Sequence, residues 1–87
     1  MVAQKVTIIN PTGLHLRPAG VFCNAASNFR CKVEFRYKEA TANAKSVLSV
    51  LGACIKKGDT IELVCDGEDE TEALHTMVSL IEEGLGE

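Results

Sequence analysis

Aromatic residues are scarce in this sequence, which has no tryptophan, one tyrosine and three phenylalanines among its 87 residues. Proteins that bind single-stranded nucleic acids usually stack the bases on several aromatic side chains. A surplus of basic residues is missing too, because nine lysines and arginines face twelve aspartates and glutamates, for a formal net charge of −3. Nucleic-acid-binding domains usually carry a basic patch and a high pI. We therefore expect no nucleic-acid partner.

Long apolar runs are also absent, and no run approaches the roughly 20 residues that a membrane-spanning helix needs. The residues Met1-Val2-Ala3-Gln4-Lys5 lack the apolar core of a signal peptide. We expect a cytoplasmic protein without membrane insertion. The length predicts one small domain over residues 1–87 with one modest core.

Closely spaced cysteine pairs are missing, since none of the four cysteines belongs to a C-x-x-C motif. They can form a disulfide framework, bind a metal, or serve as free thiols that pack as small hydrophobic side chains. Disulfides are disfavoured in the cytosol, and metal sites usually show paired short spacings. We favour free thiols for Cys23, Cys31, Cys54 and Cys65, and we expect Cys54, in a predicted loop, to be the most reactive.

Motifs for a metal or an organic cofactor are not found either. The sequence has no glycine-rich nucleotide loop, and the acidic run Asp66-Gly67-Glu68-Asp69-Glu70 lacks the spacing of an EF-hand. This run better fits a turn followed by a helix start. We expect no cofactor and no bound metal.

Hydrophobic periodicity divides the chain into seven elements. Val33, Phe35 and Tyr37 alternate with charged residues, which is typical of a strand with one buried face. A helix is predicted where apolar residues recur at helical spacing, at Leu16, Ala19, Phe22, Cys23 and Ala26. The predicted elements are strands over 2–9, 32–37, 40–43 and 60–65, and helices over 16–27, over 47–51 and between Asp69 and Gly84.

The ends of these elements carry recognisable signals. Asn10-Pro11-Thr12-Gly13 and Lys57-Gly58-Asp59 are typical of turns. Ser46 is a good N-cap for the short helix, and Asp69 with Glu72 resembles a capping box for the last one. Leu74, Met77, Val78 and Ile81 form the apolar stripe of that last helix. The order β-α-β-β-α-β-α predicts an α+β open-faced sandwich, with helices covering one face of a sheet.

One histidine occupies an unusual position. His15 follows the glycine turn and precedes the predicted helix, with Arg17 and Pro18 in its first turn, where a proline is tolerated. A side chain there lies beside unpaired backbone N–H groups and the positive end of the helix dipole. Such a place suits a phosphoryl group on an imidazole nitrogen. By spacing alone, a surface histidine and a solvated arginine fit as well. His75, in the last helix, has no such context.

The segment Gly13-Leu14-His15-Leu16-Arg17-Pro18-Ala19 resembles the active-site signature of HPr, the histidine-containing phosphocarrier family of the bacterial sugar phosphotransferase system. Ala44-Lys45-Ser46-Val47-Leu48 resembles the regulatory serine segment of that family. The resemblance continues to Glu83-Gly84-Leu85-Gly86-Glu87 and covers essentially the whole chain in one register. The serine and the C-terminal segment look more like HPr of low-GC Gram-positive bacteria than like enteric HPr.

The resemblance implies a four-stranded antiparallel sheet with three helices on one face. It also implies a phosphoryl-transfer intermediate, not an enzyme with its own small substrate. His15 would accept the group from enzyme I and pass it to the A domain of a sugar-specific enzyme II, and Arg17 would stabilise it. We expect a monomer that docks transiently.

Ser46 allows two interpretations, as an N-cap and as a phosphorylation site. The resemblance supports phosphorylation, with HPr kinase/phosphorylase as the partner, and it also suggests catabolite control protein A. An alternative function is therefore mainly regulatory, through phospho-Ser46 in carbon catabolite repression, although a purely regulatory protein could dispense with His15. A more distant alternative is a metal- or ligand-binding domain that uses the thiols. The candidate docking residues are Leu16, Gly20, Asn24, Val47, Leu48 and Leu51.

Overall fold

A computed structural model describes residues 1–87 and contains seven elements in the predicted order. Four strands, β1 (Val2–Thr7), β2 (Lys32–Tyr37), β3 (Ala40–Asn43) and β4 (Thr60–Asp66), combine with three helices, α1 (Leu16–Ser27), α2 (Val47–Gly52) and α3 (Glu70–Glu82). The bounds of α1 agree with the prediction. β1 ends two residues early, at Thr7, where the chain leaves the sheet toward the turn that precedes α1.

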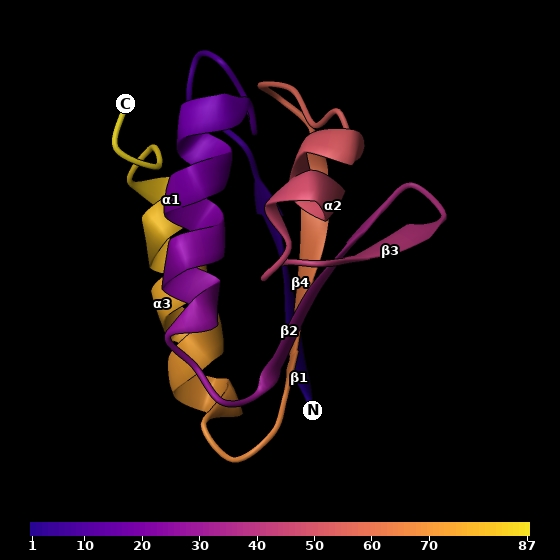
Figure 1. Ribbon diagram of the computed structural model, residues 1–87, viewed down its shortest axis with the longest axis vertical. Helices are drawn as coiled ribbons and strands as arrows, with labels where there is room; N and C mark the ends of the chain where they lie inside the picture. The colour runs from indigo at the N-terminus through magenta and orange to yellow at the C-terminus, as the bar shows by residue number, and fades with distance from the viewer.

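The strands form one antiparallel sheet in the order β1-β4-β2-β3. In Figure 1, α1 and α3 lie side by side along the sheet, and α2 lies beside the β2–β3 hairpin. All three helices contribute side chains to one core. The structure is therefore the predicted α+β open-faced sandwich.

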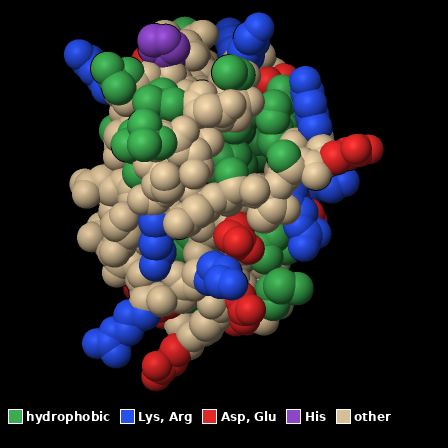
Figure 2. All heavy atoms as spheres, turned by 45° about the vertical axis from the view of Figure 1, so that its right-hand side comes forward, with side chains coloured by type: hydrophobic (Ala, Val, Ile, Leu, Met, Phe, Trp, Pro, Cys, Tyr) green, Lys and Arg blue, Asp and Glu red, His purple; other side chains and the backbone are tan.

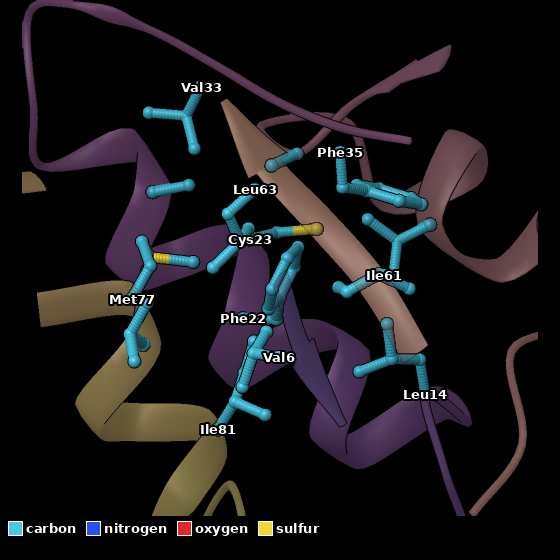
Figure 3. Close-up of a cluster of buried hydrophobic side chains, with 14 of the residues drawn as sticks. Val6, Leu14, Phe22, Cys23, Val33, Phe35, Ile61, Leu63, Met77 and Ile81 are labelled. Atoms are coloured by element: carbon cyan, nitrogen blue, oxygen red, sulfur yellow. The ribbon is translucent and has the colours of Figure 1, made fainter. Parts of the chain in front are cut away.

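The core lies between the sheet and the helices (Figure 3). Phe22 of α1 and Phe35 of β2 meet edge to face, with ring centroids 5.8 Å apart and planes at 82°. Each large apolar side chain buried in this way contributes about 1.5–3 kcal/mol to folding. The other core side chains labelled in Figure 3 are Val6, Leu14, Cys23, Val33, Ile61, Leu63, Met77 and Ile81.

The other face of the sheet carries polar side chains. The Arg36 guanidinium lies 3.4 Å from the Glu62 carboxylate, and the hydroxyls of Thr7 and Thr60 are 2.9 Å apart. Such exposed pairs contribute little to stability. No helix in the structure combines the length and the apolar character that crossing a membrane requires.

The capping box predicted at α3 is wrong. Asp69 is the N-cap residue, but its side chain makes no capping hydrogen bond. Its carboxylate instead accepts hydrogen bonds from the backbone N–H groups of Arg30 and Cys31, both at 2.9 Å. Asp69 therefore joins the start of α3 to the loop before β2. Sequence spacing cannot reveal this role, because the partners lie in another part of the chain.

The apolar spacing describes two helix faces only in part. Leu16 belongs to the apolar spacing of α1 but is 67% exposed, and Pro18 is buried. In α3, Leu74 is only half-buried, while Ala73 is fully buried. Leu16 is the first residue of α1, and its apolar spacing alone does not show whether its side chain is buried.

The cysteines occupy different environments. Cys23, Cys31 and Cys65 are free and buried, whereas Cys54 is free and exposed, as its predicted loop position implies. Burial raises the pKa of the Cys31 thiol to about 12, with a hydrogen bond to Asp69 as the next cause. Burial raises the pKa of the Cys65 thiol, and the Cys31 thiol acts on that pKa in the opposite direction, so the two thiols are neighbours, which their sequence spacing does not indicate.

Candidate functional site

His15 is the N-cap residue of α1. Its backbone is extended (φ −81°, ψ −171°), and its carbonyl accepts the hydrogen bond that opens the helix, from the Ala19 N–H at 2.8 Å. The imidazole makes no capping hydrogen bond, and the residue is exposed. The prediction that His15 lies at a helix start is therefore confirmed. Its side chain is free to react, because it has no structural bond to lose.

The first turn of α1 leaves two backbone donors beside His15. The N–H groups of Leu16 and Arg17 form no backbone hydrogen bond at the start of the helix. Pro18 follows and has no N–H to satisfy. Two donors at the positive end of the helix dipole make a favourable site for an anionic group.

Arg17 is exposed and takes part in none of the ion pairs in the structure. A guanidinium presents a planar fork of donors that suits phosphate oxygens. The positive charge of Arg17 acts on one acidic side chain, that of Glu87. The pKa of the Glu87 side chain is lowered mainly by hydrogen bonds from Asn10 and Thr12, and more weakly by the positive charge of Arg17.

The segment before His15 packs closely on another loop. Gly13 has a positive φ of 66°, and a Cβ at this position would lie 2.6 Å from the Ile55 carbonyl oxygen and 2.7 Å from the Lys56 Cα. The next residue, Leu14, donates its N–H to that same carbonyl at 3.0 Å. Glycine is therefore required here both by conformation and by the close approach of two backbones.

A groove of about 440 Å³ lies beside His15. Leu51 of α2 contributes to it, so the groove joins the histidine to the short helix. Cys54, with a positive φ of 55°, lies on its wall as well. The lining residues are Thr12, Leu14, His15, Leu51, Cys54, Ile55 and Lys56.

Ser46 caps α2, as predicted. Its backbone is extended (φ −107°, ψ 112°), and its hydroxyl oxygen accepts a hydrogen bond from the Ser49 N–H at 3.2 Å. The hydroxyl is thus already at a helix start, and the residue is half-buried.

The candidate docking residues lie on α1 and α2, which pack against each other. Leu48 is 79% exposed and Val47 is 40% exposed, whereas Leu51 is half-buried in the groove wall. Gly20 and Asn24 are exposed on α1. Figure 2 shows a histidine at one end of the molecule, with hydrophobic side chains below it and lysine or arginine side chains on either side.

Several residues around the site escape sequence reasoning. Lys56 lines the groove with His15, and Glu87 bonds to Thr12, so two distant segments meet the segment before α1. The Glu87 carboxylate accepts hydrogen bonds from the Asn10 amide at 2.9 Å and from the Thr12 hydroxyl at 2.8 Å. The only sequence signal that pointed to this part of the site was the turn at residues 10–13, since turns often carry functional groups.

The chain matches known proteins over nearly its whole length. Residues 2–83 match the family model described as "PTS HPr component phosphorylation site". Phosphocarrier protein HPr of Lysinibacillus sphaericus is 39% identical over 83 residues, which cover 95% of this chain and 94% of that protein. The HPr-like protein Crh of Bacillus subtilis is 35% identical, with coverage of 95% and 98%.

Solved structures agree with these sequence matches. HPr from Thermoanaerobacter tengcongensis superimposes with a TM-score of 0.97 at 36% identity, covering all of this chain and 98% of that one. The same protein is also known as a dimer, which matches with a TM-score of 0.80. Dimers therefore occur among the relatives of this chain, and the expected monomer stays a prediction.

Proposed function

Because this chain belongs to the HPr family of phosphocarrier proteins, we propose that it accepts a phosphoryl group on His15 from phosphorylated enzyme I. The group then passes from His15 to the A domain of a sugar-specific enzyme II during sugar uptake. The protein acts in the cytoplasm as a transfer intermediate. The observation that carries this proposal is an exposed imidazole at a helix start, next to two unpaired N–H groups.

The chemistry follows from these groups. A neutral imidazole nitrogen is a good nucleophile near pH 7. It attacks phosphorus as the bond between phosphorus and the donor breaks, and the new phosphorus–nitrogen bond breaks in turn when enzyme II accepts the group. Phosphoryl transfer depends mainly on positioning and on stabilising the charge on the oxygens. The N–H groups of Leu16 and Arg17 and the Arg17 guanidinium supply that stabilisation.

Docking on this site uses the apolar surface of α1 and α2. Leu16, Val47 and Leu48 are large hydrophobic side chains that the protein leaves exposed. A small apolar patch with a charged rim suits partners that bind briefly and then leave. Gly20, Asn24 and Leu51 complete the proposed docking surface.

The experiment mixes the protein with enzyme I and radiolabelled phosphoenolpyruvate. We expect an acid-labile label on the wild type and none on His15→Ala, with the fold of the variant intact because His15 makes no side-chain bond. His75→Ala is the matched control, since His75 is the other histidine and is exposed on α3. A label that survives in His15→Ala removes the proposal.

Ser46 provides regulation in this proposal. HPr kinase/phosphorylase would add a phosphate at the N-cap of α2, where the helix dipole favours negative charge. The phosphate would stand next to Val47 and Leu48 on the docking surface and oppose binding of an acidic enzyme I. We expect Ser46→Asp to keep the fold and to slow phosphorylation of His15. Ser46→Ala is the control, because it removes the capping hydroxyl without adding a negative charge.

Salt separates the effect of charge from other effects. Because exposed charges are screened by salt, the deficit of Ser46→Asp should shrink at a higher salt concentration. Equal rates for wild type, Ser46→Ala and Ser46→Asp at both concentrations would leave Ser46 as a cap alone.

A second candidate function is mainly regulatory, through binding of the Ser46-phosphorylated form to catabolite control protein A. The relatives named Crh, at 34–35% identity, favour keeping this candidate. It predicts that HPr kinase labels Ser46 and that the labelled protein binds the regulator. If enzyme I fails to label His15 while this binding occurs, the second candidate replaces the first.

A further inference from the structure

Asp59 joins three parts of the chain beside the sheet. Its carboxylate oxygen Oδ2 accepts hydrogen bonds from the Tyr37 hydroxyl at 2.7 Å and from the Lys56 N–H at 2.8 Å. Its own N–H donates to the Lys56 carbonyl at 3.0 Å. These bonds close the turn 56–59 and attach it to the end of β2.

The same turn holds the segment 8–14 that leads to His15. At one end, Ile8 donates its N–H to the Asp59 carbonyl at 2.9 Å, and Gly58 donates to the Ile8 carbonyl at 2.7 Å. At the other end, Leu14 donates to the Ile55 carbonyl at 3.0 Å, and Gly13 packs against Ile55. The position of the segment therefore depends on the conformation of residues 55–59.

The turn also forms part of the groove beside the histidine, since Ile55 and Lys56 line it. A shift of the turn would move both the groove wall and the start of α1. In phosphoryl transfer a displacement of about 1 Å can lower the rate as much as 100-fold, because the reacting atoms must be aligned.

We propose that Asp59, held by Tyr37, is a positioning residue for phosphoryl transfer at His15. It touches neither the phosphoryl group nor the partner. It fixes the turn on which the segment before His15 rests. This inference rests on the proposed function and adds residues that the signature around His15 does not contain.

The chemistry of the pair suits a fixed support. Hydrogen bonds from the Lys56 backbone and then from the Tyr37 hydroxyl lower the pKa of the Asp59 carboxyl, so it is ionised at neutral pH. Hydrogen bonds to an ionised acceptor are stronger than those between neutral groups. The ring of Tyr37 packs against the hydrophobic core, and this packing holds in place the hydroxyl that donates to Asp59.

The docking surface does not include this pair, because Leu16, Val47 and Leu48 lie on α1 and α2. Loss of Asp59 should therefore lower the maximal rate and leave the KM for enzyme I nearly unchanged. A merely destabilising substitution in a protein that is still folded would change neither.

The test measures phosphorylation of Asp59→Ala, Asp59→Asn and Tyr37→Phe by enzyme I over a range of protein concentrations. We expect Asp59→Ala to lower the maximal rate about tenfold with little change in KM. Tyr37→Phe removes one of the two hydrogen-bond donors to the Asp59 carboxylate and should lower the maximal rate about threefold. Asp59→Asn should fall between wild type and Asp59→Ala, because the amide oxygen can accept both hydrogen bonds but carries no charge to strengthen them. Arg36→Ala is the control, since it breaks an exposed ion pair outside the turn.

Amide hydrogen exchange gives an independent readout. The Leu14 and Gly58 amides should exchange faster in Asp59→Ala and Tyr37→Phe than in Arg36→Ala. A folded Asp59→Ala with the wild-type maximal rate overturns the proposal, and so does a loss expressed in KM. If Asp59→Ala does not fold, Tyr37→Phe decides in the same way. If enzyme I fails to label even the wild type, the proposed function fails, whereas unchanged Leu14 exchange in the variants refutes the positioning role separately.

Discussion

Gly13→Ala tests how tightly the segment before His15 is packed against the loop 55–56. Gly13 has a φ of 66°, where an alanine is strained by about 1–2 kcal/mol. The added methyl group would also lie 2.6 Å from the Ile55 carbonyl oxygen and 2.7 Å from the Lys56 Cα. Both contacts involve backbone atoms, which cannot rotate away as a flexible side chain does. One of the two segments must therefore move.

Such a movement of well-packed atoms adds roughly 1–3 kcal/mol. Together the two effects lower the free energy of unfolding by about 2–5 kcal/mol, and a loss of 1 kcal/mol corresponds to about 4–8 °C in Tm for a domain of this size. The Leu14 to Ile55 hydrogen bond lies next to the clash, so we also expect slower phosphorylation of His15.

Urea denaturation followed by circular dichroism measures the change, with two glycines as controls. Gly58 has a φ of 93° but open space around its Cβ position, so Gly58→Ala should show backbone strain without a clash. Gly20 lies in α1 with open space, so Gly20→Ala should stabilise the protein by up to about 1 kcal/mol. A loss of less than about 1 kcal/mol in Gly13→Ala would refute the close packing inferred here.

Four further substitutions test other parts of the structure. Cys23→Ser places a hydroxyl in the core and should lower the free energy of unfolding by about 1–3 kcal/mol, whereas an unchanged denaturation midpoint would contradict the burial of Cys23. Arg17→Ala should slow transfer to and from His15 about ten- to a hundredfold, through a charge-assisted contact of about 1.5–3 kcal/mol, and wild-type rates in both directions would exclude that contact. Leu48→Asp should raise the KM for enzyme I without changing the unfolding midpoint, since Leu48 is 79% exposed, and an unchanged KM would remove it from the docking surface. Hydrogen bonds from the Arg30 and Cys31 backbone N–H groups lower the pKa of the Asp69 carboxyl. Its stabilising effect is therefore present above the ordinary pKa of an aspartate and is lost as the pH falls through the lowered value. Asp69→Asn should make the free energy of unfolding depend less on pH in the acid range, and an unchanged dependence would refute this.

The sequence by itself determined the order of the helices and strands and the position of His15 at the start of α1. The alternation of Val33, Phe35 and Tyr37 indicates a half-buried strand, and the structure has one there. Pro18 and the glycine turn place the start of α1 next to His15 correctly. These signals are local, because burial on one face and tolerance of proline depend on nearby backbone geometry. Val47 and Leu48, two of the candidate docking residues, are exposed in the structure.

Only the tertiary structure decided what surrounds His15. The turn 56–59 reaches the segment 8–14 because β1 and β4 pair in one register, which brings Thr7 opposite Thr60. Asp69 likewise bonds to Arg30 and Cys31 instead of capping its own helix, because the fold brings the loop before β2 next to the start of α3. Contacts between distant segments depend on how the strands align and how the helices pack. Periodicity within one segment carries no information about that alignment, so the supports of the site become visible only in the folded chain.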